Sequence, residues 1–122
     1  MFLIHYRIRP SKIHGLGVFA AEFIPKGTVV WHYKEPTDYR IPLTESRDQF
    51  SLTYGYIPHG KDFVEIPGDG AIFVNHSTEA NVVINPLDED AMISNKDIKC
   101  GEEILCNYHE IDDNPFSGGI VK

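Results

Sequence analysis

The sequence predicts a mostly β domain with one or two short helices. Short runs of β-branched and aromatic residues recur along the 122 residues, and turns rich in glycine and proline separate them at close spacing. Few stretches show the 3.6-residue hydrophobic repeat of an amphipathic helix. A chain of this length can bury its own core without disulfides or a structural metal. We therefore expect a single domain over residues 1–122, with residues 110–122 as a short C-terminal tail.

The first half of the chain predicts strands and one helix. The strands are expected at residues 2–8 (FLIHYRI), 17–20 (GVFA) and 28–33 (TVVWHY), which are rich in β-branched and aromatic residues. Pro25-Lys26-Gly27 is typical of a turn between the second and the third. Residues 34–49 are polar and contain two prolines. Their second half predicts a short helix capped by Thr44 or Ser46.

The second half of the chain predicts a succession of short strands. These are residues 50–57 (FSLTYGYI), 62–66, 71–74, 81–85, 91–94 and the end of the segment 96–108. Pro58-His59-Gly60-Lys61 and Pro67-Gly68-Asp69-Gly70 are strong turn sequences. Residues 86–90 (PLDED) are expected to form a hairpin loop between the strands on either side.

The charge of the chain favours basic ligands. The formal net charge is −7, and such a surface repels nucleic acid backbones and attracts lysine-rich peptides. Many soluble proteins are equally acidic, so the charge alone does not identify a ligand. No apolar run approaches the roughly 20 residues of a membrane span, and the start is too short for a signal-peptide core. We expect neither direct nucleic acid binding nor membrane insertion.

Cysteine and histidine spacing does not indicate a metal site. Cys100 and Cys106 form no C-x-x-C motif and no framework of paired spacings. None of the six histidines pairs with another at i+2 or i+4. We expect no bound metal and an intracellular protein, cytoplasmic in a prokaryote or nuclear in a eukaryotic or viral setting.

Four motifs contain more polar and aromatic groups than a packed β domain requires. His14-Gly15-Leu16-Gly17 allows close backbone approach, although alone it is an ordinary turn. Tyr54-Gly55-Tyr56 places two phenols on one face of the expected strand, as a packed pair or as functional groups. Asn75-His76-Ser77 interrupts an apolar run with side chains of fixed hydrogen-bonding geometry. Residues 101–108 (GEEILCNY) place an acidic pair before a strand that ends in a tyrosine.

In this order, the motifs resemble those of SET-domain protein-lysine methyltransferases. The chain has H-G-L-G-V-F-A, I-P-K-G-T-V-V, Y-G-Y, F-V-N-H-S-T-E-A-N and I-K-C-G-E-E-I-L-C-N-Y, where the family has similar segments. The resemblance extends from near residue 7 to Tyr108. It implies the β-clip-like SET fold of small curved sheets, with the C-terminal segment threaded under a loop near N-H-S in a knot-like arrangement.

The resemblance also implies methyl transfer from S-adenosylmethionine to a lysine ε-amine, with cofactor and peptide entering from opposite faces. The backbone of His14-Gly15-Leu16-Gly17 would hold the methionine end of the cofactor. Asn75 would bond its amino-acid end, and His76 its adenine through main-chain groups, with the His76 ring tying down the C-terminal segment. Tyr108 matches the catalytic tyrosine beside the cofactor. Ser77, Glu79 and Asn81 would fix the loop under which the tail passes.

The substrate channel and the tail follow from the same resemblance. Tyr54 matches a second catalytic, channel-lining aromatic, and Tyr56 and Cys106 would line the same channel. Many relatives carry Phe or Tyr where this chain has Cys106, so there is room for more than one methyl unless strand geometry compensates. The cysteine-rich zinc modules that flank many relatives are absent from this sequence. The tail would therefore close the cofactor site, with Phe116 over the adenine.

The implied partner is a lysine-containing basic protein or peptide, such as a histone-like tail or a ribosomal protein. The acceptor lysine must lose its proton, and because no carboxylate stands out as a general base, loss through water is expected. Some minimal relatives form homodimers, which leaves the oligomeric state open. One alternative is a catalytically inactive SET-fold module that binds a peptide or the cofactor. The other is an unrelated β domain, which a closed surface between Gly15–Gly17 and Asn75-His76 would favour.

Overall fold

The fold consists of three small sheets around one core, as seen in a computed structural model that describes residues 1–44 and 48–113. The strands are β1 (Tyr6–Pro10), β2 (Leu16–Ala20), β3 (Val29–His32), β4 (Tyr39–Pro42), β5 (Phe63–Ile66), β6 (Asn75–His76), β7 (Val82–Asn85), β8 (Asp88–Ser94) and β9 (Glu103–Cys106). The helical segments are α1 (Gln49–Tyr54), the 3-10 helix η1 (Gly70–Phe73) and α2 (Tyr108–Ile111). The mostly β prediction is therefore confirmed.

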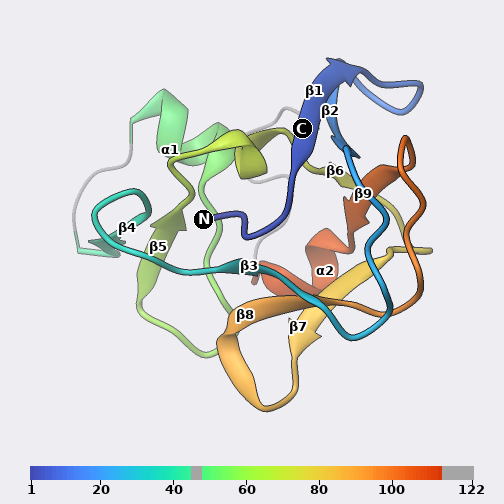
Figure 1. The fold of residues 1–122 in the computed structure, drawn as a ribbon. Helices are drawn as coiled ribbons and strands as arrows, with labels where there is room; N and C mark the ends of the chain where they lie inside the picture. Colours follow the sequence, from blue (N-terminus) through green and yellow to red (C-terminus); the bar gives the residue numbers. More distant parts are fainter. Residues whose placement is uncertain (45–47, 114–122) are drawn as a thin grey trace.

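The three sheets surround the middle of the molecule. The largest has the order β1-β2-β9-β6, and the others are β3-β8-β7 and the pair β4-β5. In Figure 1 these lie at the upper right, at the bottom and at the left of the view. All neighbouring strands are antiparallel except β6 and β9, which run parallel. Two segments far apart in sequence, the N-H-S motif and the strand before Tyr108, are thus joined directly.

The core is built from aliphatic side chains that come from both larger sheets. Its fully buried members include Val18, Ile24, Val30, Ile98 and Ile104. Ile24 and Ile98 also exchange two backbone hydrogen bonds of 2.8 Å outside the named strands. Within the described residues, no helix is long and apolar enough to cross a membrane.

The strand predicted at residues 50–57 is wrong, because Gln49–Tyr54 form helix α1. The Asp48 carboxylate caps this helix by accepting a hydrogen bond from the Ser51 amide at 2.8 Å. The rings of Phe50 and Tyr54 lie one turn apart with centroids separated by 4.9 Å. Side chains four residues apart are neighbours on a helix but lie about 13 Å apart along a strand, so this ring contact and the cap both favour the helix. The helix begins five residues after Thr44, and the other predicted cap, Ser46, lies outside the described residues.

Tyr54 and Tyr56 consequently do not share one strand face, contrary to the prediction. Gly55 ends the helix in an extended conformation, and Tyr56 pairs with Glu65 through two backbone hydrogen bonds. A side chain at position 55 would lie 2.6 Å from the Ser51 carbonyl oxygen and 2.7 Å from Val64 Cγ1. Only glycine fits this close approach of the helix end to β5.

The strand predicted at residues 71–74 is also wrong. Asp69 accepts hydrogen bonds from the amides of Phe2 and Ala71 at 2.8 and 3.0 Å, which starts the 3-10 helix η1 instead. Strand β4 was not predicted, because it lies in the polar segment 34–49 for which a helix alone was expected, and helix α2 was not predicted either. The remaining differences concern boundaries. Strand β1 begins at Tyr6, and β8 begins at Asp88, so the expected hairpin loop shortens to Pro86 and Leu87.

Residues 75–81 wrap around β9. The Ser77 and Asn81 amides donate to the Cys106 and Leu105 carbonyls at 3.0 and 3.1 Å. The buried Asn81 side chain donates to the Glu103 carbonyl and accepts from the Leu105 amide, both at 2.8 Å. The loop therefore holds β9 in place through its side chain as well as its backbone. The knot-like threading itself stays a prediction.

Replacing Asn81 by alanine should destabilise the fold strongly. The Asn81→Ala change leaves two half-buried backbone groups of β9, the Glu103 carbonyl and the Leu105 amide, without these partners, and we expect a loss of about 2 kcal/mol in the free energy of unfolding. Urea unfolding checks this value. The matched control is Asn85→Ala, because Asn85 accepts only from the nearby Leu87 amide at 3.0 Å. Equal losses in the two variants would contradict the role given to Asn81.

Candidate functional site

The side chain of Asn75 joins the glycine segment to β9. Asn75 is 1% exposed, and its Nδ2 atom donates to the carbonyls of His14 and Leu16 at 3.0 and 3.1 Å and to Glu103 Oε2 at 2.9 Å. All three partners are acceptors, so the nitrogen of the amide must face them. Within the part of the chain that the structure describes, the Oδ1 atom accepts no hydrogen bond. It is therefore available to a ligand that carries a donor.

The glycine segment is shaped by its backbone. Gly15 has a φ of 44°, in the left-handed region, and its carbonyl accepts from the Ser11 amide at 2.7 Å. Glu103 accepts from the Ser11 hydroxyl at 2.8 Å. A side chain at Gly17 would lie 2.4 Å from Glu103 Oε2, so glycine here makes room for the carboxylate that meets Asn75. The surface of the segment, from Lys12 to Leu16, is exposed to solvent.

Glu103 is a site residue that the sequence interpretation missed. The sequence shows an acidic pair at 102–103 before the strand, but only Glu102 is exposed. Glu103 is half-buried and lies between Ser11 and Asn75. The sequence could have indicated that one member of this acidic pair is buried, because the side chains of adjacent residues along a strand point to opposite faces of the sheet.

Tyr108 lies on the other side of the N-H-S segment. Its side chain is 3% exposed, and its hydroxyl donates to the Val74 carbonyl at 2.6 Å. Its backbone amide donates to Nδ1 of His76 at 3.0 Å. The ring centroids of His76 and Tyr108 are 5.2 Å apart. The His76 ring thus ties the C-terminal segment to β6, as expected.

The electrostatics of these two residues follow from burial. Burial raises the pKa of the Tyr108 phenol, so it remains a protonated donor. Burial, with a smaller effect of the positive charge of His109, lowers the pKa of His76. A neutral His76 ring is required for Nδ1 to accept from the Tyr108 amide.

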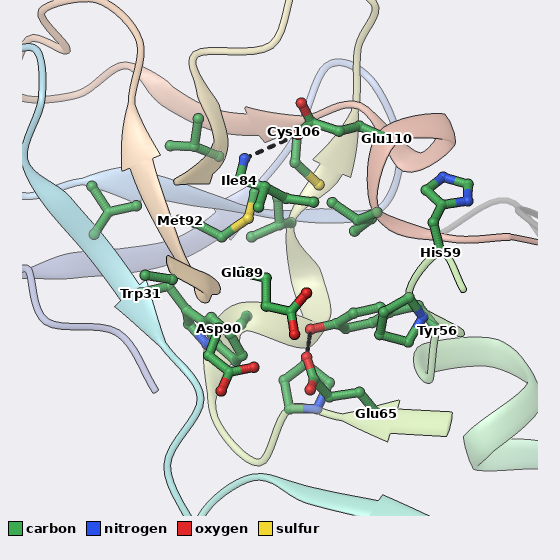
Figure 2. A pocket seen from close by; sticks show the side chains of 18 of the residues that line it. Trp31, Tyr56, His59, Glu65, Ile84, Glu89, Asp90, Met92, Cys106 and Glu110 are labelled. Carbon is green, nitrogen blue, oxygen red and sulfur yellow. Dashed lines mark hydrogen bonds between the residues drawn. The ribbon is translucent and has the colours of Figure 1, made fainter. Parts of the chain in front are cut away.

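A cavity of about 440 Å³ lies between the β3-β8-β7 sheet and the β4-β5 pair. Tyr56 and Cys106, two of the predicted channel residues, line it together with Val74. Figure 2 shows Ile84, Met92 and Cys106 on one side of this cavity, across from Glu65 and Asp90. Val74 thus lines the cavity and also accepts a hydrogen bond from the Tyr108 hydroxyl.

One ionic network forms the polar wall of the cavity. Arg40 lies with its guanidinium 3.8 Å from the Tyr33 ring centroid and pairs with Glu65 and Asp90 at 2.8 and 2.7 Å. The Tyr56 hydroxyl donates to the same Glu65 carboxylate, as the dashed line in Figure 2 indicates. Burial and the neighbouring Glu65 carboxylate raise the pKa of Tyr56. Nothing in the sequence pattern signalled this network, because its five members lie on five different segments.

The other predicted residues have separate positions. Tyr54 is not one of the cavity-lining residues of the described chain, and its ring contacts Phe73 with a centroid distance of 6.4 Å. Phe116 lies outside the described residues. Among those that the structure does describe, no three His, Cys, Asp or Glu side chains gather as metal ligands. Asn107, which precedes the catalytic candidate Tyr108, caps α2 by accepting from the His109 amide at 3.0 Å.

Acidification should weaken the fold through His76. A histidine whose pKa is lowered by folding contributes stability above its unfolded pKa of 6.5, and this is lost as the pH falls through that value. His32 has the opposite sign, because hydrogen bonds to the Tyr33 carbonyl and to Asp88 raise its pKa. In urea unfolding at pH 7.5 and 5.5, His76→Gln should lose less stability on acidification than the unaltered protein. His32→Gln should lose more stability on acidification than the unaltered protein. If both variants lost more, or both lost less, than the unaltered protein, this assignment would be contradicted.

Comparisons with known proteins agree with this geometry. The SET domain family model matches residues 15–109. A proposed histone methyltransferase of Plasmodium falciparum is similar in structure, with 28% identity, a TM-score of 0.64, and coverage of 86% of this chain and 93% of that one. A comparison with curated protein sequences gave no significant match.

Two structures of Polycomb Repressive Complex 2 of Chaetomium thermophilum share the fold. The autoinhibited complex bound to S-adenosylmethionine is 22% identical with a TM-score of 0.67, and a humanized mutant bound to an inhibitor is 23% identical with a TM-score of 0.68. This chain is covered to 91% in both, but it spans only 16% of those longer chains. With the family model matching most of its length, the chain belongs to the SET domain family.

Proposed function

We propose that this protein transfers a methyl group from S-adenosylmethionine to the ε-amine of a lysine in a basic protein or peptide. The SET domain family consists of protein-lysine methyltransferases, and one structural neighbour contains the cofactor. The observation that carries the proposal is the arrangement of residues 74–76. Asn75 holds the glycine segment, while Val74 and His76 hold Tyr108.

The glycine segment and Asn75 fit the amino-acid end of the cofactor. The Oδ1 atom of Asn75 accepts no bond from the described residues, so it suits the ammonium group of a methionine moiety. Gly15 is exposed, and its missing side chain permits close approach of a ligand to the backbone. When bound, the cofactor supplies a methyl group on a positively charged sulfur. We also propose that the His76 main chain binds the adenine and that Phe116 covers it.

The cavity fits the acceptor side. A lysine chain would pass Tyr56 and Cys106, with carboxylates such as Glu65 attracting its ammonium group. The amine must be neutral to attack, and at pH 7.4 this costs roughly 4 kcal/mol for a pKa of about 10.4. Apolar walls and the sulfonium charge both lower that pKa. Glu65 is engaged by Tyr56 and Arg40, so we propose that water takes the proton.

Tyr108 would align the reacting groups. Its hydroxyl proton is committed to Val74, so its oxygen lone pairs are directed away from that bond. A polarised methyl can donate weak C–H···O bonds to such an oxygen, worth about 0.5–1 kcal/mol each. In-line transfer needs no covalent intermediate, and alignment alone can supply about 7–11 kcal/mol. We propose Tyr54 as a further aromatic near the acceptor, because it contacts Phe73, the neighbour of Val74.

A catalytically inactive binding module is the second candidate. The observation that favours it is that Tyr108 is not one of the cavity-lining residues that the structure describes, although its hydroxyl bonds to Val74, which is one of them. The two candidates differ in a simple assay. An enzyme transfers labelled methyl from S-adenosylmethionine to lysine-rich protein, whereas a binding module retains peptide or cofactor without transfer.

Removing the Tyr108 hydroxyl should slow methyl transfer. We expect Tyr108→Phe to lower kcat by about ten-fold or more, because the Val74 carbonyl and the methyl both lose a partner. Transfer of labelled methyl to a histone mixture measures the rate, and mass spectrometry maps the modified lysines. The matched control is Tyr39→Phe on β4, where the ring is 43% exposed. Full turnover by Tyr108→Phe would remove Tyr108 from the proposed site.

A further inference from the structure

The cavity is larger than one lysine side chain requires. At about 440 Å³ it falls within the range of roughly 300–1,000 Å³ that is typical of sites for complete small ligands. The acceptor lysine contributes only an unbranched chain of four methylenes. A substrate that filled the cavity would therefore bring a second group with it.

The walls of the cavity are mainly apolar and aromatic. They include Phe2, Val30, Trp31, Phe63, Ile84 and Met92. These residues come from the N-terminal segment and from strands β3, β5, β7 and β8. Such walls stabilise a bulky aliphatic or aromatic group by removing its surface from water.

Trp31 supplies a second, independent observation. It lines the cavity and is 6% exposed, and its indole Nε1–H is the sole buried side-chain polar atom without a hydrogen-bond partner in the described chain. Buried donors are normally paired, so this one is expected to meet an acceptor that a ligand brings. The atom is covered in the structure, and a small shift of the indole or its neighbours must accompany the bond.

The charges around the cavity select a basic partner. Four carboxylates line it, from Glu65, Glu89, Asp90 and Glu110, against two cations, Arg40 and Lys61. With His59, which also lines the cavity, counted as neutral, this leaves a formal surplus of two negative charges. Arg40 is shared by Glu65 and Asp90, and Lys61 pairs with Glu89 at 2.8 Å. The surplus attracts a positively charged segment.

We infer that the cavity binds a bulky apolar side chain next to the acceptor lysine, while a main-chain carbonyl of the same peptide accepts from Trp31 Nε1. The occupant is thus a basic peptide segment with a large aliphatic or aromatic residue beside its lysine. This inference rests on the proposed function for the identity of the lysine. It adds a specificity determinant for the residue that accompanies it.

The test compares matched peptides on the unaltered protein. Each peptide has one lysine in a Gly/Ser/Arg background, with Phe, Leu or Ala placed on either side. Trp31 is the only tryptophan of the chain, so its fluorescence reports occupancy of the cavity without any turnover. We expect that, on one of the two sides of the lysine, Phe or Leu makes the peptide bind about ten-fold more tightly than Ala does. Binding of these peptides should also shift the Trp31 emission. The same ratio should appear in KM for methylation.

A cavity-filling variant adds a second readout. Ala91 lines the cavity on β8 and is 2% exposed, so Ala91→Leu should reduce the preference for a bulky neighbour to less than about two-fold. Leu87→Ala is the control, because Leu87 is 93% exposed in the β7–β8 turn. Since the peptide comparison needs no variant, the test does not depend on the folding of Ala91→Leu.

The outcomes separate this inference from the proposed function. Suppose that binding depends on the residue beside the lysine and shifts the fluorescence, but no methyl is transferred. This result would support the cavity assignment and overturn the proposed methyltransferase activity. Methyl transfer with equal KM for all peptides and no fluorescence shift would overturn the cavity assignment and support the proposed methyltransferase activity. Neither binding nor transfer would overturn both.

Discussion

The parallel pairing of Asn75 and His76 with β9 is the contact on which the rest of the structure depends. It brings the strand before Tyr108 alongside the N-H-S segment, so that three consecutive residues can act in different directions. The Asn75 amide faces the glycine segment, and the Val74 carbonyl and His76 ring face Tyr108. The Asn75 side chain is 1% exposed, and moving its amide would break all three of its hydrogen bonds at once. These bonds fix the position of Asn75 relative to the glycine segment and β9.

The two sides of the proposed site are chemically distinct. The glycine segment is exposed and offers backbone groups together with one amide oxygen, which suits a polar, zwitterionic ligand end. The cavity has apolar walls, an orphaned indole donor and a surplus of carboxylates, which suits a basic peptide. Val74 lines the cavity, its carbonyl is bonded to Tyr108, and its neighbour Asn75 holds the glycine segment. Opposed entry of cofactor and peptide, as the family resemblance implies, is compatible with this division.

The sequence predicts those elements of the fold that depend on interactions between residues close together in the chain. The mostly β architecture and the strands at β2, β3, β5, β7 and β9 follow from local composition and turns. The segment at Phe50–Tyr54 has the aromatic composition of a strand, yet the Asp48 cap and packing of its rings make it a helix. Asp69 likewise diverts residues 70–73 into a 3-10 helix.

In the candidate site too, only residues within recognisable local motifs were predicted from the sequence. Ordered motifs predicted Asn75, His76 and Tyr108 as site residues, because each has a recognisable sequence context. Glu103 and the Arg40–Glu65 network could not be identified in this way, since their partners lie far away in the chain and only the tertiary fold brings them together. Trp31 is similar: its missing hydrogen-bond partner is a property of the packed cavity and not of any sequence pattern.

Backbone amide chemical shifts of the unaltered protein during titration with S-adenosylmethionine test the arrangement most directly. If residues 74–76 join the cofactor side to Tyr108, the largest shifts occur at residues 14–17 and 74–76 and saturate together, with smaller shifts at Tyr108. An absence of shifts, or shifts confined to β3, β5 and β8 around the cavity, would contradict it.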